Sequence, residues 1–238
     1  MSIFGDVRLD HRFDWMMDRI VSTGSVVLRR LGQDRAGELA AHRFLDNPRI
    51  CVDEIIATFS ERCAGRRIIA VQDTTEINFS GRDRGRTGLG AGGNGDALGF
   101  FIHPVIAIDR DDEAVVGLVD AQIWTRQDAA LAPHRSRIFA DKESYRWLVG
   151  AERSQQRLAA AASVVMVGDR EADIYALFAR CPKALCLTVV ESYEVDPPKG
   201  VKPLNWRLLT SLAVDDEADA QEIIYIYRQR WRIEEVFR

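Results

Sequence analysis

Two aspartates in this sequence each follow a short apolar run. Asp73 comes directly after residues 68–72, IIAVQ, and Asp169 comes after residues 163–168, SVVMVG. Such runs are typical of strands buried on both faces, and strand ends are where an open sheet presents side chains to ligands. Two carboxylates brought together there repel each other unless a positive charge lies between them. A divalent metal ion is the simplest such charge.

A third carboxylate is available near the C-terminus, where residues 219–238 have the pattern of a helix. The candidates on this stretch are Glu234 and Glu235. Mg²⁺ prefers carboxylate, water and phosphate oxygens, so three converging carboxylates predict a two-metal site for phosphoryl transfer. The alternative for each aspartate alone is a helix cap or a solvated turn, which is the more common role after a strand.

The residues around these carboxylates resemble the three catalytic segments of DDE transposases. In the family's order, the segments are residues 70–75 (AVQDTT), 167–174 (VGDREADI) and 225–235 (YIYRQRWRIEE). Among these enzymes, the segments resemble those of the insertion-sequence-four family, which includes the transposase of transposon five. The last segment of this family has the pattern Tyr-x2-Arg-x3-Glu-x6-Lys, which the chain matches as far as the glutamate.

The resemblance implies a role for each matching position. The catalytic triad, which would also bind the metal ions, consists of Asp73, Asp169 and Glu234. Contacts to DNA phosphates around the scissile position are implied for Arg170, Tyr227 and Arg230. Glu235 is the neighbouring carboxylate and not the first choice for the triad. The alternative for Arg230 and Arg232 is ion pairing with Glu234 on a helix surface.

A tryptophan upstream of this segment has a counterpart in the same family. Residues 197–206, PPKGVKPLNW, resemble the segment leading to a tryptophan that stacks on a nucleotide flipped out of the duplex. Trp206 stands 21 residues before Tyr227, as in the family. Since a tryptophan at the start of a strand usually belongs to a core, core packing is the alternative. Residues 4–48 also resemble the family's DNA-end-recognition subdomain.

The chain departs from the family's pattern in two places. Only 65 residues separate Asp169 from Glu234, where the family inserts a β-rich domain. The sequence also stops at Arg238, before the lysine of the pattern and before the C-terminal region that supports pairing of two protomers. A truncated or internally deleted copy of a mobile element is therefore one interpretation.

The resemblance implies a DNA transposase that performs cut-and-paste phosphoryl transfer at transposon ends. Its cofactor would be two Mg²⁺ ions, with Mn²⁺ as a substitute. Its partners would be double-stranded DNA, as transposon ends and target, and a second copy of the chain in a homodimer. The alternatives are a non-catalytic remnant that binds DNA ends or interferes with the full-length enzyme, and a ribonuclease-H-like nuclease.

The elements that must position these residues follow from the apolar pattern. Residues 8–56 repeat apolar side chains at helical spacing, with breaks at Gly24-Ser25 and Asn47-Pro48, which predicts short amphipathic helices. The expected domains are a helical subdomain over 1–64 and a catalytic core over 65–238, with a reduced insertion around 188–206. The resemblance implies an α/β fold for the core, a ribonuclease-H-like mixed sheet flanked by helices.

The pattern also predicts the remaining elements of this core. We expect a glycine-rich loop over 80–99 and an antiparallel hairpin of strands 100–109 and 114–124. The other expected elements are helices at 142–162, 172–180 and 219–238 and strands at 184–190 and 206–213.

Composition gives a mixed indication for a DNA partner. The net charge of −4 produces no overall positive field, which counts mildly against nucleic-acid binding. The 32 basic residues comprise 28 arginines and 4 lysines, and arginine is the better bidentate ligand for phosphate, although codon bias also explains the ratio. Four cysteines, no signal peptide and no membrane-length apolar run predict a cytoplasmic protein. The resemblance implies a bacterial one, associated with the nucleoid when bound to DNA.

Overall fold

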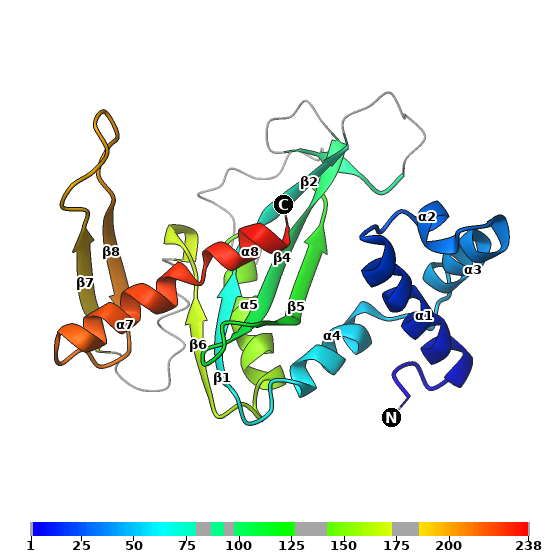
Figure 1. Cartoon of the computed structure of the whole chain (residues 1–238), viewed down its shortest axis with the longest axis horizontal. Helices are drawn as coiled ribbons and strands as arrows, with labels where there is room; N and C mark the ends of the chain where they lie inside the picture. The colour runs from blue at the N-terminus through cyan, green and yellow to red at the C-terminus, as the bar shows by residue number, and fades with distance from the viewer. Residues whose placement is uncertain (1, 80–86, 93–97, 127–141, 173–185, 238) are drawn as a thin grey trace. The chain divides into compact units, whose positions relative to one another are not determined.

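The computed structural model describes residues 2–79, 87–92, 98–126, 142–172 and 186–237. The chain divides into two compact units, Met1–Phe59 and Ser60–Arg238 (Figure 1). None of the helices in the described ranges is long and apolar enough to cross a membrane.

The first unit is helical, as the apolar spacing predicts. Its helices, the last of which runs into the second unit, are α1 (Val7–Thr23), α2 (Leu28–Gly32), α3 (Arg35–Leu45) and α4 (Val52–Glu61). The Asp6 side chain caps the start of α1, and Gly24 ends it with φ of 58°, a left-handed conformation that glycine adopts without strain. The core of this unit is built around Phe4, Met16, Ala41 and Phe44.

The second unit contains a mixed six-stranded sheet. Its strands are β1 (Arg67–Gln72), β2 (Thr75–Phe79), β3 (Gly90–Ala91), β4 (Leu98–Asp109), β5 (Val115–Trp124) and β6 (Ser163–Val167). The long strand β4 is antiparallel to β1, β2, β3 and β5, whereas β6 is parallel to β1. A strand parallel to its neighbour requires a crossover, and α5 (Tyr145–Arg157) lies on the intervening chain.

Strands β1 and β2 both pair antiparallel with β4, in one continuous register. Gln72 pairs with Val105 and Thr75 pairs with Ile102, so the register continues across the interruption between them. The two residues in the gap, Asp73 and Thr74, lie opposite Pro104 and His103 in that register. Since proline has no N–H to donate, it is suited to a point where the ladder is interrupted.

Helices cover both faces of the sheet (Figure 1). One face packs Ile68, Ala70, Val105 and Ala107 against residues that include Cys63 and Leu158, at the end of α5. The other face packs Ile69, Val71, Ile106 and Val167 against the C-terminal helices α7 (Glu217–Arg228) and α8 (Trp231–Val236). The sheet is therefore the central layer, with β1 buried on both faces.

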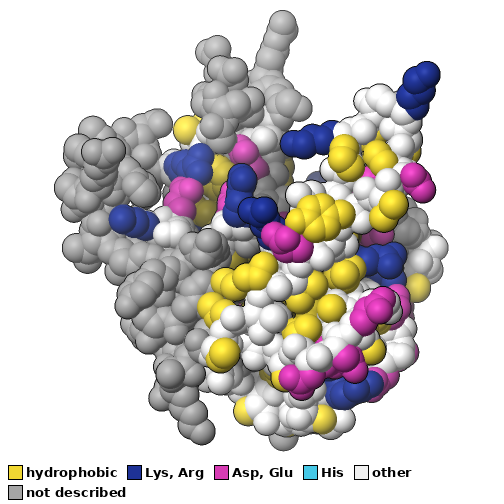
Figure 2. Space-filling model, turned by 90° about the vertical axis from the view of Figure 1, so that its left-hand side faces the viewer, with side chains coloured by type: hydrophobic (Ala, Val, Ile, Leu, Met, Phe, Trp, Pro, Cys, Tyr) yellow, Lys and Arg dark blue, Asp and Glu magenta, His cyan; other side chains and the backbone are white. Residues whose placement is uncertain are grey.

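A separate two-stranded sheet packs on α7. Strands β7 (Thr188–Tyr193) and β8 (Asn205–Thr210) form an antiparallel hairpin whose inner side chains, Val190 and Leu208, contact Ile223 of α7. On this side of the molecule, hydrophobic side chains lie beside acidic and basic ones (Figure 2).

Several predicted elements are confirmed, and others need correction. The paired strands 100–109 and 114–124 and the strand before Asp169 are present at nearly the expected bounds. The predicted helix over 142–162 is shorter, the strands at 184–190 and 206–213 are shifted to β7 and β8, and the expected loop over 80–99 contains β3. The predicted helix over 172–180 lies outside the described residues except for Ala172.

The C-terminal stretch was predicted as one helix but forms two. The break falls at Gln229 and Arg230, whose N–H groups donate to the carbonyls of Ile226 and Tyr227 in three-residue turns. No glycine or proline causes this break, so its origin is tertiary.

Candidate active site

Asp73 lies in the interruption between β1 and β2. Its Oδ1 accepts a hydrogen bond of 2.7 Å from the backbone N–H of Thr74. The Asp73 side chain is 22% exposed, so it is half-buried at the edge of the cavity described below. Because Asp73 lies in this gap, it takes no part in the strand pairing but stays next to the sheet.

Asp169 lies at the equivalent end of the neighbouring strand. In the parallel pairing of β1 and β6, Val71 is opposite Val167, so both aspartates stand two residues beyond a paired position. Asp169 Oδ1 accepts a hydrogen bond of 2.7 Å from the N–H of Glu171 in a 3₁₀ turn, η3 (Arg170–Ala172). The capping role expected as the alternative is therefore present, and it coexists with the position at the strand end.

Glu234 is joined to Asp73 by a shared arginine. Nη1 of Arg230 lies 3.2 Å from Asp73 Oδ2 and 3.1 Å from Glu234 Oε1. The Arg230 side chain is 9% exposed, whereas that of Glu234 is 50% exposed. The predicted pairing of Arg230 with Glu234 is thus observed, but Arg230 is buried and also contacts Asp73, 157 residues away in the sequence. Arg232 instead pairs with Glu113 and Glu235.

Burial and neighbouring charges both act on the ionisation of the Asp73 carboxyl. Burial raises the pKa of Asp73, and the nearby carboxylates of Asp169 and Glu234 raise this pKa further. The Thr74 N–H and the Arg230 guanidinium act in the opposite direction. Asp169 and Glu234 therefore both lie close enough to Asp73 to oppose its ionisation.

An open cavity of about 620 Å³ adjoins these residues. Its lining includes Asp73, Thr74, Glu234 and Glu235. Glu235 has its own partner, because its Oε2 lies 3.3 Å from Nη1 of Arg232. This difference favours Glu234 over Glu235 as the third carboxylate, since only Glu234 shares a partner with Asp73.

The donor chemistry of the triad fits Mg²⁺, because all three side chains offer hard anionic oxygens. In the described part of the chain, however, no group of three His, Cys, Asp or Glu side chains is close enough to hold a metal ion. Arg230 occupies the position between two of the three carboxylates instead. The site is therefore arranged around a guanidinium in this conformation.

The remaining predicted DNA-contacting residues are Trp206, Tyr227 and Arg170. Trp206 and Tyr227 contact each other edge to face, with ring centroids 5.3 Å apart, and Arg230 Cζ lies 5.9 Å from the Tyr227 ring centroid. Trp206 is half-buried and packs with the hairpin core, as its alternative interpretation requires. Arg170 is exposed in the turn directly after Asp169.

A buried polar network behind Asp73 was missed from the sequence. His103 is completely buried, its Nδ1 is 2.8 Å from the Thr74 hydroxyl, and its Nε2 is 3.2 Å from Gln72 Oε1. Since Oε1 only accepts, Nε2 carries the proton and Nδ1 accepts from Thr74. The network fixes the residues on either side of Asp73. A histidine within the apolar run of β4 was the available signal.

A second cavity, of about 540 Å³, also includes Thr74 and Thr75 in its lining. Beside it the rings of Phe101 and Trp124 stack, and each carries a guanidinium on a face, Arg126 on Phe101 and Arg146 on Trp124. Phe101 is buried, and each ring already has the other ring and a guanidinium against it, so this stack is part of the packing of the protein.

No known protein-family model matches this chain. The function must therefore be argued from the site itself.

Proposed function

We propose that this chain is a DDE transposase of the insertion-sequence-four type, which acts on DNA by metal-dependent phosphoryl transfer. The observation that carries the proposal is the position of Asp73 and Asp169 at adjacent ends of parallel strands, with Glu234 linked to Asp73 through Arg230. Carboxylates from two strands and a helix are the donor set that such chemistry needs.

The sheet supports a ribonuclease-H-like core for this activity. Three antiparallel strands, formed by β1, β4 and β5, are followed by a helix and then by β6, which is parallel to β1. We infer that this arrangement is the ribonuclease-H-like framework, with the expected DNA-end-recognition role assigned to the helical first unit.

When bound, the metal ions would activate water or a 3′ hydroxyl and stabilise the leaving oxygen of an in-line displacement. Asp73, Asp169 and Glu234 would hold them. Arg230, Tyr227 and Arg170 would contact the phosphates on either side of the scissile bond, and Trp206 would stack on an unpaired base. These contacts orient the substrate, which contributes to the rate independently of the metal.

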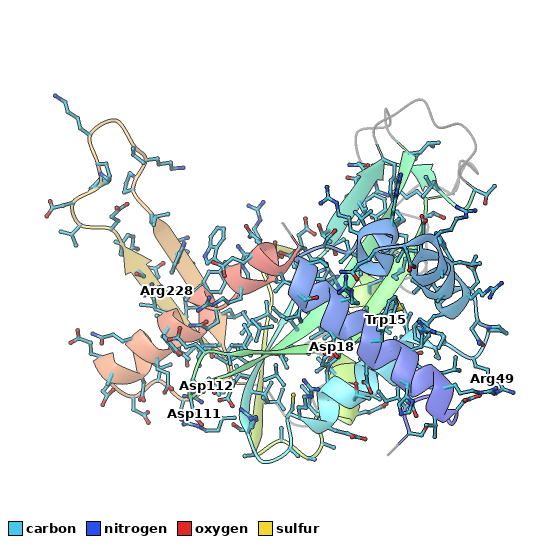
Figure 3. The ribbon with its side chains drawn as sticks, turned by 45° about the vertical axis from the view of Figure 1, so that its right-hand side comes forward. Trp15, Asp18, Arg49, Asp111, Asp112 and Arg228 are labelled. Carbon is cyan, nitrogen blue, oxygen red and sulfur yellow. The ribbon has the colours of Figure 1, made fainter. Side chains whose placement is uncertain are left out.

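Cleavage of end-bearing DNA tests the proposal. The purified chain is incubated with a labelled duplex carrying the DNA that flanks its reading frame, in Mg²⁺ or in EDTA. Mg²⁺-dependent nicking is expected from the wild-type chain and none from Asp169→Asn. The matched control is Asp111→Asn, which removes an exposed carboxylate from the turn between β4 and β5 (Figure 3). Equal nicking by Asp169→Asn and the wild type would overturn the assignment.

A non-catalytic remnant that binds DNA ends is the second candidate. The observation that favours it is the guanidinium between Asp73 and Glu234, which offsets one of their two negative charges without a metal ion. A remnant would bind end-bearing duplex without cleaving it. A simple ribonuclease-H-like nuclease would instead cleave duplexes with and without the flanking DNA equally well.

A further inference from the structure

Asp73 and Asp169 follow equivalent positions of two neighbouring parallel strands. The register of β1 and β6 makes Gln72 and Gly168, the residues directly before the aspartates, the next pair of equivalent positions. The valine that precedes each of them packs with α7 and α8 on one face of the sheet. Since successive residues of a strand face opposite sides of the sheet, Gln72 and Gly168 face α5.

Helix α5 meets these two positions with a glycine and a tryptophan that are three residues apart. Gly150 lies against Gln72, because a Cβ on residue 150 would be 3.0 Å from Gln72 Oε1. Trp147 lies against Gly168, because a Cβ on residue 168 would be 2.8 Å from Cζ3 of the indole. Residues three apart share a face of a helix, so these contacts form one interlocking surface, and both helix residues are buried. Glycine is unfavourable within a helix, and this close approach explains its place in α5.

His103 connects the same surface to Asp73. The rings of Trp147 and His103 pack edge to face, with centroids 4.8 Å apart. The Thr74 hydroxyl lies 2.8 Å from His103 Nδ1, and the Thr74 N–H donates to Asp73 Oδ1 over 2.7 Å. Contacts from Trp147 therefore reach both aspartates, one through this network and the other through Gly168.

We propose that α5 fixes the Asp73 and Asp169 carboxylates relative to each other, with Trp147 and His103 as positioning residues. The inference rests on the proposed function, because groups that act on one reacting centre must be held in a narrow geometry. Two neighbouring carboxylates repel each other, and a close-packed support behind both strand ends opposes their separation. Neither positioning residue lines the cavity beside Asp73 and Glu234, so both act through the aspartates.

Exchange of two backbone amides with solvent, measured by NMR on the full chain without metal or DNA, tests the inference. The amides of Thr74 and Glu171 each donate over 2.7 Å to Oδ1 of the nearby aspartate. Trp147→Leu removes the indole from both contacts, so both amides should exchange about tenfold faster relative to the amides of β4. The matched control is Leu158→Ala, which removes a buried side chain at the far end of α5 and should leave this ratio unchanged.

Unchanged exchange at both amides in Trp147→Leu would overturn the inference. Equal acceleration of both amides by Leu158→Ala would overturn it as well, because the effect would then follow from any loss of packing around α5.

A second variant decides the question even if Trp147→Leu does not fold. Thr74→Val keeps the shape of the side chain but loses the hydroxyl that donates to His103, which breaks the contacts on the Asp73 side alone. The amide of residue 74 should exchange faster, while the Glu171 amide exchanges as in the wild type. Thr74→Ser, which keeps the hydroxyl, should restore slow exchange. Faster exchange at both amides of Thr74→Val, or at neither, would contradict the proposed connection.

Nicking kinetics distinguish this inference from the proposed function. If both hold, Trp147→Leu should lower kcat for Mg²⁺-dependent nicking about tenfold and leave KM for the duplex near the wild-type value, because only the geometry of the reacting groups changes. A kcat that equals the wild-type value after correction for the unfolded fraction would overturn the positioning role. Absence of nicking by the wild-type chain would remove the proposed function, and the amide measurements would still decide whether α5 holds the two aspartates.

Discussion

At the scale of single residues, His103 links the stability of the protein to pH. Burial, with a smaller effect of Arg146, lowers the pKa of His103 to about 4 from a usual value of 6.5. The unfolded chain therefore takes up a proton between pH 6.5 and 4 that the folded chain does not. The free energy of unfolding should fall by about 3 kcal/mol as the pH drops through this range, at 1.36 kcal/mol per pKa unit.

Urea unfolding at a series of pH values measures this effect. The His103→Gln variant keeps a polar side chain without the titrating ring, so its stability should change less between pH 6.5 and 4. The carboxylates contribute to both curves, and the difference between the curves isolates the histidine. Parallel curves for the two proteins would show that His103 does not set the pH dependence.

Gly168, directly before Asp169, leaves no room for a side chain. A Cβ on residue 168 would lie 2.7 Å from the Ala172 Cβ and 2.8 Å from Cζ3 of Trp147, which is buried. Gly168→Ala should therefore lower the free energy of unfolding by about 1–3 kcal/mol. In urea unfolding, Gly168→Ala combined with Ala172→Gly should lose less stability than the sum of the two single changes. Strict additivity would contradict the predicted contact.

At the scale of elements, the packing of hairpin β7–β8 on α7 depends on Trp206. Its ring contacts Tyr227 and belongs to the cluster around Val190 and Leu208. We expect Trp206→Ala to lower the free energy of unfolding by about 2 kcal/mol, less than for a fully buried tryptophan because the side chain is half-buried. The control is Tyr193→Ala on the exposed side of β7. If Trp206→Ala lowers the free energy of unfolding no more than the control does, Trp206 does not stabilise the packing of the hairpin on α7.

Elements with strong local patterns could be predicted from the sequence, and elements set by distant contacts could not. The apolar runs before Asp73 and Asp169 predicted β1 and β6. Only β1 is buried on both faces, as such a run indicates; β6 pairs with β1 alone in the described residues, and its Ser163 and Val164 are exposed. The break at Arg230 could not be predicted, since its neighbours are good helix formers and its partner Asp73 is 157 residues away. Strand β2 was missed because its pairing with β4 extends a register that only the folded sheet reveals.

In the candidate site, too, only the features with a local sequence pattern could be predicted. The positions of the aspartates after strands could be read from the pattern, and the choice of Glu234 rested on the resemblance. The network of His103 with Thr74 and Gln72 joins residues from two strands, and nothing local signals its geometry. Buried polar partners depend on register, which the sequence leaves open.

At the scale of the whole molecule, the proposed DNA affinity has to come from local arginines, because the net charge is −4. Each phosphate contact releases counter-ions, so the affinity for duplex DNA should fall steeply with salt. Arg230→Ala should reduce the slope of log K against log salt by about one unit, as expected for one lost phosphate contact. Fluorescence anisotropy over a range of salt concentrations measures both slopes, and identical slopes would remove Arg230 from the DNA contacts.

The central claim is that Asp73, Asp169 and Glu234 form one metal-dependent site for cleaving DNA. The most direct measurement compares the rate of Mg²⁺-dependent nicking of end-bearing duplex by Glu234→Gln and Glu235→Gln, two adjacent and isosteric changes on α8. Loss of nicking in Glu234→Gln with near wild-type nicking in Glu235→Gln is the predicted result. Nicking that survives Glu234→Gln, or that is lost only in Glu235→Gln, would contradict the account.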